Sequence, residues 1–553
     1  MRQVVVRGSG LTIGDLIAVA RHHATVEVSR EAVVQERILR SRQVIQRAIA
    51  DGCAIYGVTT GFGGMSHVAI SPDQAAALQA NLLCFLKTGC GERLPEHDVR
   101  SGMLLRANSL ARGVSGVRPE LIERLARFLN ERVTPHVMSL GSIGASGDLV
   151  PLSYVAGALI GSDNGYLVDM PGETVTAVTA LKRLGLEPIT LEPKEGLALV
   201  NGTSMLTGIA AGCSHDAWQL AAMSLAAHAV MLQALMASGQ PFAPFIHDHK
   251  PHPGQRFAAA RMVELLAGSK FIRTLKAERE CQEGAVPIQD RYSVRCLPQY
   301  FGPILDGLAT IRKQIEVEMN SATDNPLLDP ASDTSYHGGN FLGQYIAVGM
   351  DQCRYYLGLV AKHLDVQISV LMEPAFSGGL SASLVGNPQR SVNMGLKGLQ
   401  LVGNSIMPLI GFYGNSLADR FPTHAEQFNQ NINSQGFGSA HLARQSVALS
   451  RQHVAIALIV GIQAVELRTR MLTNHCDARR LLSAATIPLY ETLYALFGKS
   501  PDPSRPLVFN DNEQSLDHFL NAITADMAGS GRLWQAIEPL MDRFDSCSTE
   551  CGS

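Results

Sequence analysis

The sequence predicts a mainly α-helical protein: a large bundle of long central helices with a smaller mixed N-terminal region. Hydrophobic residues make up 46% of the 553 residues and charged residues only 17%, so the chain must bury an extensive core. Long apolar runs of helix-favouring residues recur from the middle of the chain onward, whereas segments typical of strands are short. Helices of about 25 residues are roughly 40 Å long, and several such helices pack best as a bundle.

Strand-like segments are few and short. They are VVVRG at 4–8, GYLVDM at 165–170 and EPITLEP at 187–193. Breaks that contain glycine and proline predict loops between the helical blocks, near 60–72, 141–151, 239–254 and 374–388. We expect one continuous unit with three regions: an N-terminal region at 1–200, the central long-helix bundle at 201–475 and a C-terminal helical region at 476–553.

The central bundle is predicted from four long apolar segments, at 217–237, 343–372, 392–420 and 438–471. The first segment runs for 21 residues without a formal charge, which is long enough to span a bilayer. It nevertheless contains Gln219, His228 and Gln233, and it has no basic flank to set an orientation. We therefore interpret it as a buried helix and expect no membrane association.

Charge and cysteine content argue against several classes of protein. The formal net charge is −3 and no basic stripe is present, which argues against a nucleic-acid partner. The ten cysteines are scattered without a CxxC pair, and the start MRQVVVRGSG lacks the apolar core of a secretory signal. These features indicate a reducing cytoplasm. His247, His249 and His252 do not match the common zinc spacings, so no catalytic metal is expected.

The stretch GSIGASGDLVPLSY at 141–154 contains three small residues in a row, Ala145, Ser146 and Gly147. Taken alone, they indicate a turn in which a serine or Asp148 caps the following helix. A second interpretation is chemical. In a tight bend the Gly147 amide nitrogen can attack the Ala145 carbonyl carbon, closing a five-membered ring with loss of water. Loss of the Ser146 hydroxyl as a second water leaves an exocyclic methylidene, an electrophile made from protein alone.

Eight motifs follow one another along nearly the whole chain. They are YGVTTGFGG at 56–64, GSIGASGDLVPLSY at 141–154, EGLALVNGTSMLTG at 195–208, KPHPGQ at 250–255, QDRYSVRCLPQ at 289–299, TDNPL at 323–327, HGGNFLGQ at 337–344 and AEQFNQNINS at 425–434. In this order they resemble the aromatic amino acid ammonia-lyases and aminomutases, a family that includes histidine ammonia-lyase. The resemblance implies the histidine/phenylalanine ammonia-lyase fold. It also implies that Ala145, Ser146 and Gly147 cyclise to the family's cofactor, 4-methylidene-imidazole-5-one (MIO).

The resemblance also assigns a catalytic base. The amine of an amino acid is a poor leaving group and its β-proton is barely acidic, so elimination needs an electrophile for the nitrogen and a base for the proton. In the family that base is the tyrosine of the YGxxTGFG loop, here Tyr56. A tyrosine with a pKa near 10 needs positive potential to act near neutrality, and helix N-termini are a candidate source.

The same resemblance assigns the other polar residues of the site. Arg295 would bind the substrate carboxylate, Tyr292 would lie nearby and assist in proton handling, and Asn201 would bond near the ring or the bound amine. Two residues would complete the carboxylate site: Gln289 and Asn325. Four residues would close the polar end of the site: Lys397, Glu426, Asn429 and Gln430. We interpret three neighbours as ion-pairing residues: Asp290, Arg291 and Asp324.

The substrate class is predicted from LQANLLCFLKTG at 78–89. In the family two residues of this stretch read the substrate ring, and this chain places Phe85 and Leu86 there; Phe341 would line the same pocket. Tyrosine-specific enzymes resemble this stretch with a histidine at the first position, and histidine ammonia-lyases with Ser-His. Phe85 offers only an apolar wall, and an unpartnered phenol hydroxyl would cost about 1–3 kcal/mol there. Phenylalanine is therefore favoured over tyrosine and histidine.

The resemblance predicts non-oxidative deamination of L-phenylalanine to trans-cinnamate and ammonia, in phenylalanine catabolism or cinnamate biosynthesis. Alternatives are a phenylalanine 2,3-aminomutase, a tyrosine or histidine ammonia-lyase, and a catalytically silent helical scaffold. The only other partners expected are further copies of the chain. The low-charge helices and the resemblance together predict a homotetramer with shared sites, in which Arg295 comes from a chain next to the one that carries the triad.

Overall fold

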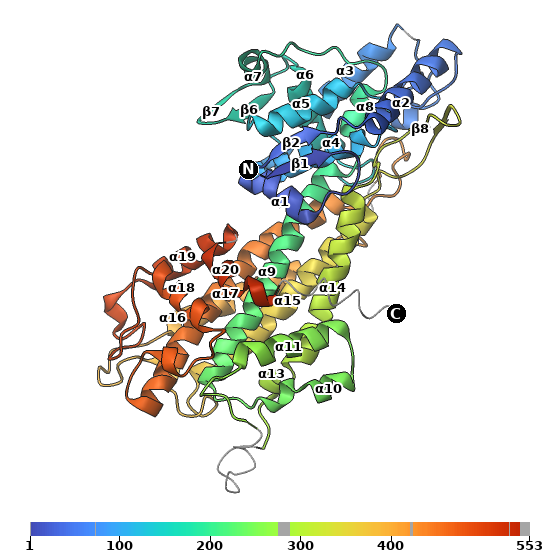
Figure 1. Ribbon diagram of the computed structural model, residues 1–553. Helices are drawn as coiled ribbons and strands as arrows, with labels where there is room; N and C mark the ends of the chain where they lie inside the picture. Colours follow the sequence, from blue (N-terminus) through green and yellow to red (C-terminus); the bar gives the residue numbers. More distant parts are fainter. Residues whose placement is uncertain (1, 72, 275–287, 421–423, 530, 542–553) are drawn as a thin grey trace. The chain divides into compact units, whose positions relative to one another are not determined.

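The computed structural model describes residues 2–71, 73–274, 288–420, 424–529 and 531–541 (Figure 1). The chain divides into two compact units, each assembled from three segments. The first unit contains 1–215, 311–351 and 416–444, and the second contains 216–310, 352–415 and 445–553. Four long helices contribute residues to both units: α9 (Ser204–Ala234), α14 (Leu297–Met319), α15 (Gln344–Met372) and α17 (Gly436–Thr473). The expected division at 1–200, 201–475 and 476–553 stays a prediction.

The first unit is mixed, with short helices and short strands. Its own helices are α1 (Ile13–His22), α2 (Ala32–Ala50), α3 (Ala75–Leu86), α4 (Glu96–Ala111), α5 (Pro119–Asn130), α6 (Leu149–Ile160), α7 (Ala177–Leu184) and α8 (Glu195–Val200). Its strands are β1 (Gln3–Val6), β2 (Thr25–Val28), β3 (Cys90–Arg93), β4 (Thr134–Pro135), β5 (Met138–Leu140), β6 (Leu167–Met170), β7 (Glu173–Thr176), β8 (Leu327–Asp329) and β9 (Thr334–Tyr336).

These strands form small separate sheets rather than one large sheet. β1 pairs with β2 in parallel, and β3 pairs antiparallel with β5. β4, β6 and β7 form an antiparallel sheet, and β8 and β9 form a hairpin. The strands predicted at the N-terminus and at GYLVDM are therefore confirmed as β1 and β6. The predicted strand EPITLEP is wrong, because two of its residues, Pro188 and Pro193, lack the N–H that a sheet requires.

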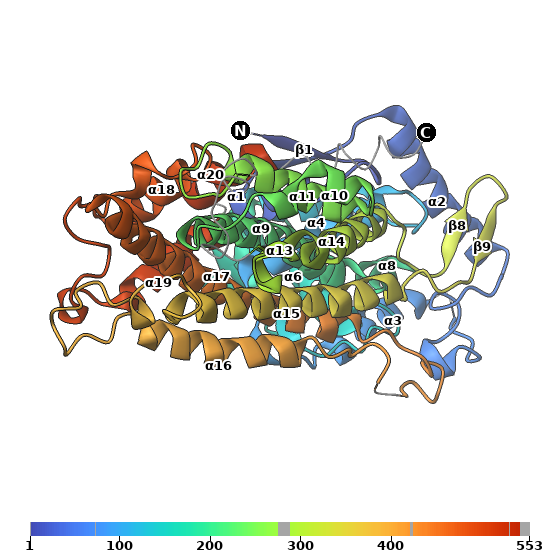
Figure 2. The same ribbon diagram turned by 90° about the horizontal axis from the view of Figure 1, so that it is seen from below.

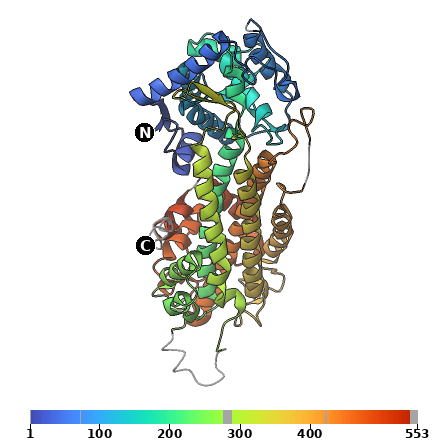
Figure 3. The same ribbon diagram turned by 90° about the vertical axis from the view of Figure 1, so that its right-hand side faces the viewer.

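The described residues of the second unit form helices and connecting loops, without a strand of the kind found in the first unit. Beyond its shares of the long helices the second unit contains α10 (Pro244–Asp248), α11 (Pro253–Leu266), α13 (Tyr292–Arg295), α16 (Lys397–Tyr413), α18 (Ile487–Leu496), α19 (Leu516–Ala528) and α20 (Arg532–Met541). In this unit α15 and α16 lie side by side, so that a Cβ built on Gly358 would be 3.7 Å from the Cα of Gly411 (Figure 2). α14 runs beside α15, and the Tyr300 hydroxyl donates to the Leu359 carbonyl at 3.2 Å (Figure 3).

The long-helix prediction is confirmed in three of its four segments, and in the fourth, 392–420, the helix is shorter than expected, with 17 residues. α15 and α17 coincide with the runs at 343–372 and 438–471, while α9 contains most of 217–237 and α16 lies within 392–420. Among the described residues one helix, α17, is long and apolar enough to cross a membrane. However, 78% of its most apolar 18-residue window is buried inside the protein, as expected for a core helix.

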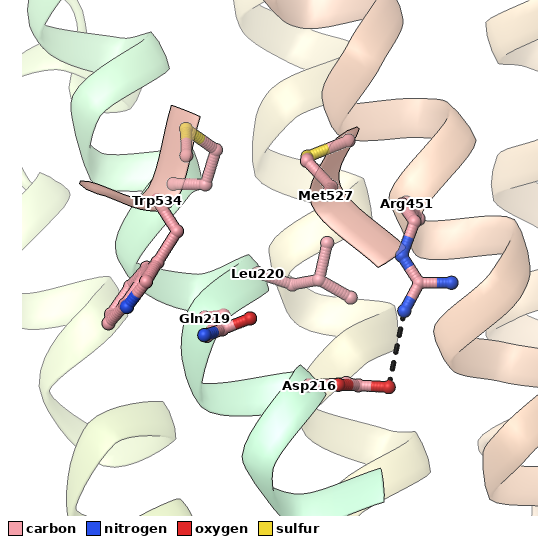
Figure 4. A pocket seen from close by; sticks show the side chains of 7 residues that line it. Asp216, Gln219, Leu220, Arg451, Met527 and Trp534 are labelled. Carbon is pink, nitrogen blue, oxygen red and sulfur yellow. Dashed lines mark hydrogen bonds and ion pairs between the residues drawn. The ribbon is translucent and has the colours of Figure 1, made fainter. Parts of the chain in front are cut away.

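The core of the second unit also holds polar groups. Glu466 of α17 is fully buried and accepts hydrogen bonds from the Tyr490 and Tyr494 hydroxyls of α18 and from the Leu507 N–H. Burial raises the pKa of Glu466 to about 7, although these hydrogen bonds oppose the shift. A small pocket also lies between α9, α17, α19 and α20 (Figure 4). Its lining includes the Asp216–Arg451 ion pair but no predicted site residue.

Candidate active site

The turn that carries Ala145, Ser146 and Gly147 lies between β5 and α6. Gly147 has a φ of +66°, and a Cβ at this position would come within 2.1 Å of the Gly202 carbonyl oxygen. The N–H of Asp148 donates to the same oxygen at 2.7 Å. Backbone conformation and space therefore both require glycine at 147. A glycine at 147 also leaves its amide nitrogen unhindered, which the ring closure expected from the sequence requires.

Two side-chain amides hold Ser146. Asn201 Nδ2 donates to the Ser146 carbonyl oxygen at 3.0 Å, and Gln430 Nε2 donates to its hydroxyl at 3.1 Å. Asn201 Oδ1 is buried, and within the described part of the chain it has no hydrogen-bond partner. A buried acceptor without a partner is costly, so this oxygen is available to a donor such as an amine. These residues fit a cyclised triad with a bound amine beside it.

Asp148 joins the triad turn to the start of α9, a role that the sequence did not reveal. It precedes α6, but its side chain makes no capping hydrogen bond to that helix, so the cap interpretation is wrong. Its carboxylate instead accepts from the Leu206 N–H at 2.7 Å and the Ser142 hydroxyl at 3.0 Å. Burial raises the pKa of Asp148 to about 7, against the effect of these hydrogen bonds.

Tyr56 lies in the same unit, and its phenol is held by the glycine-rich loop that follows it. The Gly63 N–H donates to the Tyr56 hydroxyl oxygen at 2.8 Å. A Cβ at Gly63 would lie 1.8 Å from Glu426 Oε2, so glycine is needed for this close approach. Burial raises the pKa of Tyr56; the Gly63 hydrogen bond lowers it in part, and the Glu426 charge raises it further.

Residues 425–430 fold into an unusual turn that carries three of the predicted site residues. Glu426, Gln427 and Phe428 all have positive φ, at 54°, 49° and 65°. Left-handed backbone costs roughly 1–2 kcal/mol per residue outside glycine, so this turn stores strain. It places Glu426 against Gly63 and Gln430 against Ser146. Asn429 is exposed in the same turn.

The residues predicted to read the substrate ring differ in exposure. Leu86 is buried in α3, whereas 53% of Phe85 is exposed in this chain. Phe341 is half-buried. The first unit thus contains residues 145–147, Tyr56, Asn201 and Gln430 together with these apolar residues.

Four predicted residues belong to the second unit. Gln289, Tyr292 and Lys397 are exposed, and Arg295 is half-buried in α13. The Arg295 guanidinium lies over the Tyr292 ring, 4.5 Å from its centroid. Asp290, at the start of this segment, accepts from Arg273 at 2.7 Å and from the Ser238 N–H at 2.6 Å. Its predicted ion-pairing role is therefore confirmed.

The histidine-rich segment at 247–252 has structural contacts. The buried His247 ring lies within hydrogen-bond distance of the Pro241 carbonyl, at 2.9 Å, and of the Gln255 amide, at 3.1 Å. His249 contacts the Phe245 carbonyl at 2.7 Å. Across the described ranges no group of three or more His, Cys, Asp or Glu side chains is placed to hold a metal ion.

Known proteins are similar to this chain over nearly its whole length. The family model of the aromatic amino acid lyases matches residues 11–492. The chain is 55% identical to a phenylalanine ammonia-lyase of Nostoc punctiforme, over 98% of this chain and 95% of that protein. It is 48% identical to an aromatic ammonia-lyase of Loktanella atrilutea, over 98% and 99% of the two chains. The solved structure of a phenylalanine aminomutase from Pantoea agglomerans has a TM-score of 0.87 and 27% identity, over 96% and 100%.

The helical fold, the site and these matches together define a carbon–nitrogen lyase. The predicted enzyme class is confirmed. The chain belongs to the aromatic amino acid lyase family.

Proposed function

We propose that this enzyme converts L-phenylalanine to trans-cinnamate and ammonia, using an MIO group formed from Ala145, Ser146 and Gly147. The observation that carries the proposal is the convergence of Asn201 and Gln430 on Ser146, in a turn that only glycine can complete at 147. The cyclised triad supplies an electrophile that turns the substrate nitrogen into a better leaving group. No metal takes part in the proposal.

The chain's own residues bind the substrate and move its proton. Tyr56 Oη accepts the β-proton as the amine departs, while the Gly63 N–H stabilises the phenolate. Asn201 Oδ1 accepts a hydrogen bond from the amine. Arg295 and Asn325 bind the carboxylate, with Gln289 beside them, and Tyr292 assists proton transfer. Three further residues close the polar end: Lys397, Glu426 and Asn429.

A direct assay tests the reaction and its rival. The enzyme is incubated with phenylalanine, tyrosine and histidine, and cinnamate, coumarate, urocanate and β-amino acids are quantified. We expect cinnamate and ammonia from phenylalanine in excess of all other products. Predominant β-phenylalanine would instead identify a phenylalanine 2,3-aminomutase, the alternative that the shared fold with the Pantoea enzyme favours.

Phe85→His is expected to raise the tyrosine-to-phenylalanine ratio of kcat/KM by about tenfold, because the imidazole gives the phenol hydroxyl a partner. The measurement is steady-state kinetics with both substrates. Cys84→Ser, at the neighbouring position of α3, serves as the control and should leave the ratio unchanged. An unchanged ratio in Phe85→His would mean that this residue does not face the substrate ring.

We further propose a cytoplasmic homotetramer with sites shared between subunits. The second unit exposes large apolar side chains along α16, with Leu401, Leu409 and Phe412 at 65%, 51% and 70% exposure. Monomeric proteins rarely expose such apolar faces, so α16 is suited to contact another copy. Within one chain, burial and the Glu426 charge raise the pKa of Tyr56, so a further source of positive potential would favour its action as a base. Neighbouring subunits are the proposed source.

Complementation tests this sharing. Ser146→Ala and Arg295→Ala should each be nearly inactive as homotetramers, whereas co-expression should restore part of the activity. Some mixed tetramers then hold a site with an intact triad from one chain and an intact arginine from another. Hybrid tetramers detected by mass spectrometry but without activity would place both residues in sites formed by a single chain.

A further inference from the structure

Two fully buried charges meet in the first unit, and one of them, Asp324, is a residue predicted to form an ion pair. Lys194 Nζ lies 2.6 Å from Asp324 Oδ2, and neither side chain is exposed to solvent. Moving two charges out of water is unfavourable, and well-packed apolar residues often hold a fold as well as a buried ion pair does. Stability alone is therefore a poor explanation for this pair.

The backbone at Lys194 strengthens that argument. Its φ of +79° and ψ of −27° lie in the region that favours glycine. Glycine at this position would relieve the strain, yet the chain places a lysine there. The strain is tolerated to put an ammonium group beside Asp324.

Asp324 in turn fixes Asn325, a predicted ligand of the substrate carboxylate. Asp324 Oδ1 accepts the Asn325 main-chain N–H at 2.7 Å, and Asn325 Oδ1 accepts the Gly338 N–H at 2.7 Å. Because Asn325 Oδ1 already accepts this hydrogen bond, the orientation of the Asn325 side-chain amide is set, and its Nδ2 remains available as a donor. No residue among those described accepts a hydrogen bond from it. A carboxylate is the acceptor that such a donor suits.

A second buried cation, Arg106, interacts electrostatically with Lys194 and Asp324, and we call these three residues the buried charge cluster. Arg106 donates to the Asn201 carbonyl at 2.6 Å and to Thr323 Oγ1 at 3.3 Å. Burial lowers its pKa to about 10, and the charges of Asp324 and Asp148 oppose that shift. The buried charge cluster therefore contacts the main chain of Asn201 through Arg106 and that of Asn325 through Asp324.

We propose that Lys194 and Asp324 are a positioning pair for Asn325. The ammonium fixes the Asp324 carboxylate, the carboxylate fixes the Asn325 N–H, and the Asn325 side-chain amide then donates to the substrate carboxylate. The pair does not touch the substrate. The inference rests on the proposed function, which makes an amino-acid carboxylate the ligand of Asn325.

Two uncharged double variants separate positioning from stability. K194M/D324N removes both charges but keeps an oxygen that accepts the Asn325 N–H. K194M/D324L also removes both charges and has a similar volume, but it has no acceptor. We expect the leucine variant to raise the KM for phenylalanine about tenfold or more relative to the asparagine variant, with a smaller change in kcat. Exchange of the Asn325 amide hydrogen should be faster in the leucine variant only.

Equal KM values in the two variants, or equal exchange at Asn325, would overturn the positioning role. Intact mass should show the same loss of two waters in both, so that cofactor formation is not the cause of any difference. K194M/D324A replaces the leucine variant if that protein does not fold. A wild-type enzyme that makes no cinnamate would instead refute the proposed function, and the exchange experiment would still decide whether the pair holds Asn325.

Discussion

Replacing Ser146 with alanine is expected to abolish turnover, the largest effect of any substitution considered for this enzyme. Alanine has no hydroxyl to leave, so the methylidene cannot form even if the ring closes. The intact mass of the wild-type chain should be lower than its sequence mass by two waters, and Ser146→Ala should lack at least the second loss. Intact-mass measurement and a cinnamate assay on the same sample provide both readouts.

A nearby serine supplies the matched control. Ser153 of α6 donates to the Val150 carbonyl at 2.7 Å and takes no part in the turn. Ser153→Ala should keep the two-water loss and the activity. A fully active wild-type enzyme with unmodified mass would contradict the chain-derived electrophile.

Tyr56→Phe is expected to reduce kcat/KM by about 10²–10⁴-fold while the two-water mass loss is retained, because only the proton acceptor is removed. A tyrosine pKa is ordinarily near 10, and burial and Glu426 raise that of Tyr56 within one chain, so the phenolate fraction increases as the pH rises. The rate of the wild-type enzyme should therefore rise with pH across the neutral range. The phenylalanine variant should lose this rise, which pH–rate profiles of both proteins will measure.

Glu426→Gln provides the companion variant. Glutamine has nearly the same shape as glutamate and can pack against Gly63 in the same way, but it lacks the negative charge that raises the pKa of Tyr56. The rise of the rate with pH should therefore shift toward lower pH. A wild-type rate in Tyr56→Phe would show that another group takes the proton. An unshifted rise in Glu426→Gln would show that this rise does not report on Tyr56.

The helical architecture was predictable because its signal is local and repeated. The low-charge apolar runs that became α15 and α17 leave few alternatives to buried helices. EPITLEP misled because its alternating apolar residues resemble a strand, while its two prolines prevent regular pairing. The division into two units was not predictable, since each unit is assembled from three segments that are separated in the sequence by parts of the other unit.

The residues of the candidate site were predictable from motifs, but the contacts and backbone conformations that hold them in place were not. The turn around Ser146 and the loop after Tyr56 contain glycines at positions where the structure leaves no space for a side chain, as at Gly147 and Gly63. Nothing local in the sequence shows that Asp148 binds the Leu206 N–H, since its position beside α6 suggests a cap. The left-handed turn at 426–428 contains no glycine, so no residue type predicts its conformation.

The assembly of the first unit from three distant segments also sets an order of events during synthesis on the ribosome. The triad leaves the ribosome early, yet Ser146 bonds to Gln430, 284 residues later, and the Gly144 carbonyl accepts from Ser434, 290 residues later. At about 5–20 residues per second, tens of seconds separate the triad from these supports in a nascent chain. Folding around residues 145–147 is therefore completed only after most of the polypeptide has been made.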